Sequence, residues 1–203
     1  MTGSAVDCGE KTAVQRKFML RNTDSRFGKV AILLHWSIAL IVIAEFGVGL
    51  YMTGLEYFHP LYNTLPHYHE SVGMLLAVLI VVRFFWSAWN IKPAPGAGVG
   101  QWEQRASFVV QTLMLTIVIG VIVFGFLLST AEGNPLKVFN WFELPALVLR
   151  DSQEDLSLFW HYWLAWTVIA LASLHTLGAL KHHLIDHDET LRRMLGLGPR
   201  PKK

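Results

Sequence analysis

The residues of this chain whose type and spacing could do chemistry are histidines in apolar surroundings. They are His35, His69, His161 and His175. A histidine inside a membrane span is unfavourable without a partner, which makes it a candidate for a functional site. His161 and His175 are 14 residues apart, close to four helical turns, so they share one helix face about 21 Å apart along the axis. We expect that face to point into the protein, because lipid offers no partner to an imidazole.

Four apolar stretches must position these histidines, each close to the roughly 20 residues that cross the hydrocarbon layer. The stretches lie at about 30–53, 69–89, 106–129 and 158–185. Only 16% of the 203 residues are charged, against about 25% in a soluble domain. We therefore predict an all-α fold, a transmembrane four-helix bundle in contact with the lipid bilayer. The expected organisation is a polar tail over 1–25, the helical domain over 26–190 and a basic tail over 191–203.

Basic residues predict the orientation of these spans. They gather before the first span, between the second and third, and after the fourth: Lys11, Arg16, Lys17, Arg21, Arg26, Lys29; Arg83, Lys92, Arg105; and Lys181, Arg192, Arg193, Arg200, Lys202, Lys203. The other two loops contribute only Lys137 and Arg150. The positive-inside rule then predicts up-down-up-down topology with both termini cytoplasmic. No cleavable signal peptide is expected, because the first 26 residues contain no apolar segment.

Depth in the membrane sorts the four histidines into pairs. His35 lies early in the first span and His175 late in the last, so both lie toward the cytoplasm. His69 opens the second span and His161 lies near the start of the fourth, so both lie toward the outer side. Two imidazoles that face each other between helices are the axial ligation of a low-spin haem, and helix bundles hold cofactors in this way. We predict one haem between His35 and His175 and another between His69 and His161.

Small residues near the histidines support this interpretation, and other uses of the histidines compete with it. A haem plane against a helix needs small side chains near its ligand, and four residues after each histidine come Ala39, Gly73, Ala165 and Ala179. Packed histidines without a ligand remain an alternative. Zinc or non-haem iron would need three or four ligands at one point, which the separation of His161 and His175 forbids. With Cys8 as the single cysteine and no C-x-x-C-H motif, a disulfide within the chain and covalent haem attachment are excluded.

Neighbouring polar residues have open roles. His67 competes with His69, which is preferred because Gly73 follows it by one turn. Arg83 could pair with a propionate of the inner haem, or extend to the lipid headgroups. His182 could border a quinone or a propionate, or be a solvated interfacial residue. Glu45, in the middle of the first span, could relay protons or bond to a facing helix, and the second role is preferred.

These features together resemble the bacterial di-haem cytochrome b561 family, over roughly residues 26 to 195. The matching motifs are, in order, His35–Trp36, His69 with Gly73, EGNP at Glu132–Pro135, Trp160–His161, Leu174–His175 with His182–His183, and LRRM at Leu191–Met194. Single motifs of this kind are weak, whereas the ordered set is specific. The resemblance implies an inner-membrane protein in which the four matched histidines ligate two b haems.

The resemblance also implies a function. Members of the family pass single electrons to or from a quinone such as ubiquinone, and some act as superoxide:ubiquinone oxidoreductases. The expected outer loops are acidic, however, with Glu56, Glu70, Glu132, Glu143, Asp151, Glu154 and Asp155. A negative surface disfavours the approach of superoxide and suits a basic soluble redox partner better. No interaction with nucleic acid is expected.

Two other classes of function were considered. The chain could be the cytochrome b subunit of a larger membrane complex, such as a hydrogenase or formate dehydrogenase, with its acidic loops as a docking surface. It could also be a transporter or a structural membrane protein whose histidines carry protons or pack. A red preparation with a reducible alpha band would exclude the last class, and co-purification of an iron–sulfur subunit would favour the first.

Overall fold

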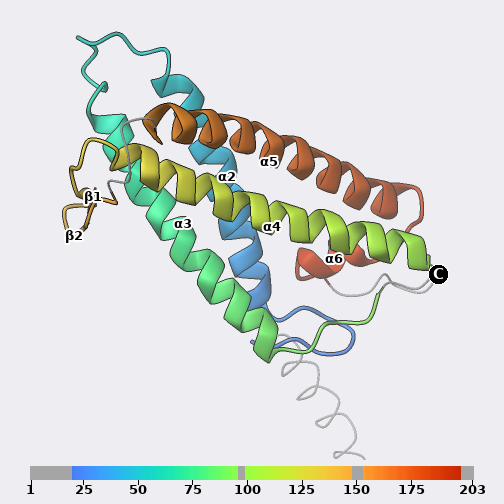
Figure 1. Cartoon of the computed structure of the whole chain (residues 1–203). Coiled ribbons are helices and arrows are strands. Elements are labelled where there is room, and N and C mark those ends of the chain that lie inside the picture. The colour runs from blue at the N-terminus through green and yellow to red at the C-terminus, as the bar shows by residue number, and fades with distance from the viewer. Residues whose placement is uncertain (1–19, 96–98, 148–152, 198–203) are drawn as a thin grey trace, which may run out of the picture.

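Over the residues that the structure describes, the protein is mostly helical, with four long helices and a small hairpin (Figure 1). The computed structural model describes residues 20–95, 99–147 and 153–197. The elements are α2 (Lys29–Met52), α3 (Thr64–Trp89), α4 (Gln101–Ser129), β1 (Leu136–Val138), β2 (Phe142–Leu144), α5 (Gln153–Leu184) and α6 (Thr190–Met194). The four long helices are each long and apolar enough to cross a membrane. The prediction of four apolar spans in an all-α protein is confirmed.

The long helices form two closely packed pairs, α2 with α3 and α4 with α5. Figure 1 shows that α2 and α4 begin, and α3 and α5 end, toward the same side of the molecule. We call this side the termini end, and the opposite side, which carries β1 and β2, the hairpin end. The helices converge at the hairpin end and diverge toward the termini end (Figure 1). Both described ends of the chain therefore lie on one side.

Hydrogen bonds hold the connecting segments together at the termini end. The Asn22 side-chain amide donates to the carbonyl of Ile91 at 2.9 Å, and the Trp36 indole donates to the carbonyl of Met194 at 2.9 Å. The Trp36 N–H thereby ties α6 to α2. Part of the basic segment after the fourth span is thus a short helix that packs back onto the protein.

Three of the long helices begin about five residues before the apolar stretches that predict them. Polar residues in their first turns explain the extension. In α4 the Glu103 carboxylate accepts a hydrogen bond from the backbone N–H of Gly100 at 3.1 Å. In α5 the first turn contains Glu154 and Asp155, whose negative charges are favourable at a helix N-terminus. Apolar composition marks the part of a helix in lipid, whereas capping extends the helix beyond it.

A hairpin that the sequence did not predict closes the connection between α4 and α5. β1 and β2 pair antiparallel, with Leu136 opposite Leu144, and the turn residues Phe139 and Asn140 have positive φ angles of 47° and 61°. Ser71 on α3 is fully buried, and its hydroxyl accepts the backbone N–H of Phe139 at 3.0 Å. The hairpin is therefore attached to α3 two residues after His69.

The buried core lies between the two levels at which the histidines occur. It contains Leu76 and Ile80 of α3, Val118 of α4 and Val168 of α5. Ile38, Ile41 and Val42 of α2 pack against it. In sequence, these residues fall between His69 and Arg83 on α3 and between His161 and His175 on α5. An aliphatic layer therefore separates the two histidine levels.

We expect Ser71→Ala to loosen the hairpin and to lower stability by about 1–2 kcal/mol, because the buried N–H of Phe139 would lose its acceptor. Amide hydrogen exchange over residues 136–144 should report faster exchange. Ser173→Ala is the matched control, because its hydroxyl donates only to the Ile169 carbonyl of its own helix. Equal exchange in both variants would contradict this role for Ser71.

Candidate functional site

The structure brings the four sequence-predicted histidines together in two pairs. The rings of His69 on α3 and His161 on α5 have centroids 6.1 Å apart and planes at 85°; we call them the hairpin-end pair. The rings of His35 on α2 and His175 on α5 are 6.5 Å apart at 67°; we call them the termini-end pair. His67, the competitor of His69, contacts the Tyr68 ring at 5.6 Å instead. The juxtaposition expected from depth and helix face is present in the structure.

These separations fit two imidazoles that share one metal ion. A metal–imidazole bond is about 2 Å long, and the ring centre lies about 1 Å beyond the nitrogen. Two rings on opposite sides of an iron therefore have centroids about 6 Å apart. All four rings are partly buried. The residues present therefore fit the axial ligation of a haem at each pair.

Partners on the far side of the hairpin-end rings orient them. Nδ1 of His161 lies 2.9 Å from the backbone carbonyl oxygen of Val121 on α4. Nδ1 of His69 lies 2.7 Å from Oε2 of Glu45 on α2. Metal-binding histidines usually donate their second ring nitrogen to a carbonyl or a carboxylate. Both contacts leave Nε2 as the nitrogen available to a metal.

Glycine on α4 allows His161 to occupy its position. A Cβ atom placed on Gly125 would lie 2.9 Å from both Cε1 and Nδ1 of His161, closer than unbonded atoms normally approach. Gly73, which the sequence singled out, has open space where its side chain would be. Gly125 and the carbonyl of Val121 were missed, because the third span carries no histidine. The signal available was the pair Gly120 and Gly125, since small residues in a membrane helix often mark a close approach.

Arg83 lies at the termini-end pair. It comes from α3, is partly buried, and interacts electrostatically with both His35 and His175. The edge of the Trp36 ring contacts His35 at 5.4 Å between centroids. A partly buried cation beside two imidazoles is suited to an anionic group bound between them, which is the role considered for Arg83 from the sequence.

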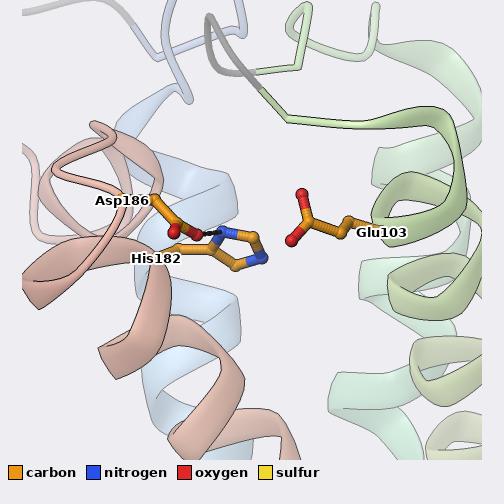
Figure 2. Close-up of side chains that lie close together, drawn as sticks. All are labelled: Glu103, His182 and Asp186. Carbon is orange, nitrogen blue, oxygen red and sulfur yellow. Dashed lines mark ion pairs between the residues drawn. The ribbon is translucent and has the colours of Figure 1, made fainter.

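His182 belongs to a separate charged cluster near the termini end (Figure 2). Its Nδ1 lies 2.7 Å from Oδ2 of Asp186. The ammonium of Lys181 lies 2.7 Å from Oε1 of Glu103 and 2.8 Å from Oδ2 of Asp186. Potential metal-ligating atoms of Glu103, His182 and Asp186 lie within 4.8 Å of one another, but Lys181 already neutralises both carboxylates. The cluster is an ion-pair network that joins α4 to the end of α5.

The comparisons with known proteins identify the family. A family model described as prokaryotic cytochrome b561 matches residues 26–197. The chain belongs to this family. Cytochrome b561 homolog 2 of Escherichia coli (strain K12) is 38% identical over 176 residues, which cover 86% of this chain and 94% of that protein. Cytochrome b561 homolog 1 of the same organism is 26% identical over 181 residues, which cover 84% of this chain and 97% of that protein.

Membership of the cytochrome b561 family establishes the general activity. The chain is a multi-pass membrane protein that binds haem b and transfers electrons. The resemblance stated from the ordered histidine motifs is confirmed. The histidine pairs are the part of this cytochrome that is suited to haem, because they offer two facing imidazoles at each level.

We expect Gly125→Ala to lower the haem content of this cytochrome, because the added methyl group would displace the His161 ring. The measurement is the haem-to-protein ratio of the purified protein. Gly120→Ala is the control, since on the same helix its Cβ would meet only a methyl carbon of Leu164 at 3.0 Å. Full haem content in Gly125→Ala would show that this close approach is unimportant.

The Lys181–Asp186 ion pair predicts a dependence on pH. The hydrogen bond from Lys181 lowers the pKa of the Asp186 carboxyl below its ordinary value of 3.8. A carboxyl with a lowered pKa contributes stability above its unfolded-state pKa and loses it as the pH falls through the folded-state pKa. Asp186→Asn should therefore unfold at a lower temperature than the parent at pH 7, and this difference should disappear in acid. Thermal unfolding followed by tryptophan fluorescence would measure it, and a difference that persists in acid would contradict the assignment.

Proposed function

We propose that this cytochrome binds two b haems and passes single electrons between them. His35 and His175 would be the axial ligands at the termini-end pair, and His69 and His161 those at the hairpin-end pair. The observation that carries the proposal is that both pairs have the ring separation of two ligands on one iron. When bound, haem supplies the one-electron redox chemistry, while the protein supplies ligation, spacing and electrostatics.

Two histidines at each iron determine the kind of reaction. A haem held by two histidines would have no open position for oxygen. Outer-sphere electron transfer to or from a donor nearby is therefore favoured. Arg83 would bind an anionic propionate at the termini-end pair, and its electrostatic interaction with both rings there supports this role. His182 is less suited to that role, since its Nδ1 is engaged by Asp186.

The distribution of charge supports termini on the cytoplasmic side of the inner membrane. Basic residues at the termini end include Arg21, Arg26, Lys29, Lys92, Arg105, Arg192 and Arg193. The positive-inside rule places such an end in the cytoplasm. The hairpin end would then face the outside, with one haem near each side of the membrane. A quinone pool, in the form of ubiquinone or a related quinone, would exchange electrons with this protein within the bilayer.

The electrostatics of the hairpin end favour a basic soluble redox partner there over superoxide. The described acidic residues at this end include Glu56, Glu132, Glu143, Glu154 and Asp155. Lys137, a cation of this end, lies 3.6 Å from the Glu143 carboxylate. An anion such as superoxide would approach against this field, whereas a cationic protein would be attracted. Titration of the reduced and oxidised cytochrome with superoxide and with quinol distinguishes these reactions.

A haem count tests the ligand assignment. The pyridine haemochrome assay of the purified cytochrome should give two b haems per chain. His161→Ala should lose the hairpin-end haem and keep the other, because the termini-end pair lies beyond the aliphatic layer. His67→Ala is the matched control and should retain both. One haem in the parent protein, or loss of both haems in His161→Ala, would refute the assignment.

A further inference from the structure

A carboxylate in the middle of α2 is aimed at one of the candidate ligands. The Glu45 side chain is 14% exposed and its Oε2 lies 2.7 Å from Nδ1 of His69, whose side chain is 17% exposed. The preferred role of Glu45 from the sequence, contact with a facing helix, is confirmed. An ionisable group at this depth requires a partner. Among the described residues neither Oε2 of Glu45 nor Nδ1 of His69 makes a hydrogen bond, so the contact between them is a close electrostatic one.

We propose that Glu45 is a positioning residue that holds the His69 ring and lowers the reduction potential of the hairpin-end haem. The proposal rests on the ligand assignment made above. A carboxylate has no proton-donating group when ionised, so its closeness to Nδ1 favours the ring proton on that nitrogen and leaves the lone pair of Nε2 for iron. A carboxylate on the second nitrogen makes an imidazole a stronger electron donor to its metal. A stronger donor stabilises ferric over ferrous iron.

The two levels differ in the charges that surround them. At the hairpin-end pair the negative Glu45 faces His69 and also acts electrostatically on His161. At the termini-end pair the positive Arg83 acts on both rings. A negative charge disfavours addition of an electron, and a positive charge favours it. Both effects make the termini-end haem the better electron acceptor, so electrons would flow downhill from the hairpin end to the termini end.

The difference between the partners of His69 and His161 shows why Glu45 is the tuning residue of its pair. His161 donates to the neutral carbonyl of Val121, which belongs to the α4 backbone. The partner of His69 is instead the charged side chain of Glu45, which a substitution can remove. Charge close to a haem ligand is among the means by which proteins set haem potentials. Glu45 supplies such a charge 2.7 Å from His69.

Redox potentiometry of the purified di-haem cytochrome tests the proposal. Glu45→Gln keeps the size and an acceptor oxygen but removes the charge. It should raise the equilibrium constant for reduction of the hairpin-end haem tenfold or more. This corresponds to a rise of about 59 mV in the one-electron reduction potential. The termini-end haem should be unchanged, and His161→Ala, which keeps only that haem, identifies its potential. Glu143→Gln is the matched control, because it removes an exposed hairpin-end carboxylate that is paired with Lys137.

The possible results separate this proposal from the ligand assignment. Two haems in Glu45→Gln, with both potentials as in the parent, would overturn the role of Glu45 and leave the ligands intact. A parent protein without two haems would refute the assignment itself. Glu45→Ala adds a second measurement, since loss of ring orientation should change the electron paramagnetic resonance signal of the hairpin-end haem. An unchanged signal in Glu45→Ala would also contradict the proposal.

Discussion

The structure depends on the requirement that an imidazole within the membrane find polar neighbours. Lipid supplies none, so facing helices must. At the hairpin-end pair the outer nitrogens are met by Glu45 on α2 and by the Val121 carbonyl on α4. These contacts join α2 to α3 and α4 to α5, the helix pairs that also pack most closely. The polar contacts of two histidines thus involve all four long helices.

Much of this arrangement could be predicted from the sequence, because hydropathy and helical periodicity are patterns that extend over many residues of one chain. The four spans, the pairing of His35 with His175 and the pairing of the outer histidines follow from length, depth and helix face, whereas the choice of His69 over His67 was made from Gly73, around which the structure has open space. Glu45 was correctly expected to contact a facing helix, although its partner was not named. That partner depends on the rotation of α2 against α3, which apolar composition does not determine.

Features that rest on backbone groups or on local turns escaped prediction. The hairpin is attached to α3 by a hydrogen bond from the backbone N–H of Phe139 to the Ser71 hydroxyl. A strand of three residues is too short for its alternation of polar and apolar side chains to be recognised in the sequence. The approach of His161 to Gly125 depends on the distance between two helices. The short helix α6 lies in a segment that reads as a basic tail. Its contact with Trp36 involves a main-chain carbonyl, which every residue possesses.

The aliphatic layer formed by Leu76, Ile80, Val118 and Val168 has a consequence for energy coupling. Its side chains carry no group that could pass a proton, and a closely packed apolar interior excludes water. In the proposed transfer between two haems, an electron would cross this layer without a compensating ion. Transfer of a whole charge across a membrane is worth about 2.3 kcal/mol per 100 mV of potential. The membrane voltage would therefore oppose or assist electron transfer between the two histidine levels. The size of this effect would be proportional to the fraction of the bilayer that the electron crosses.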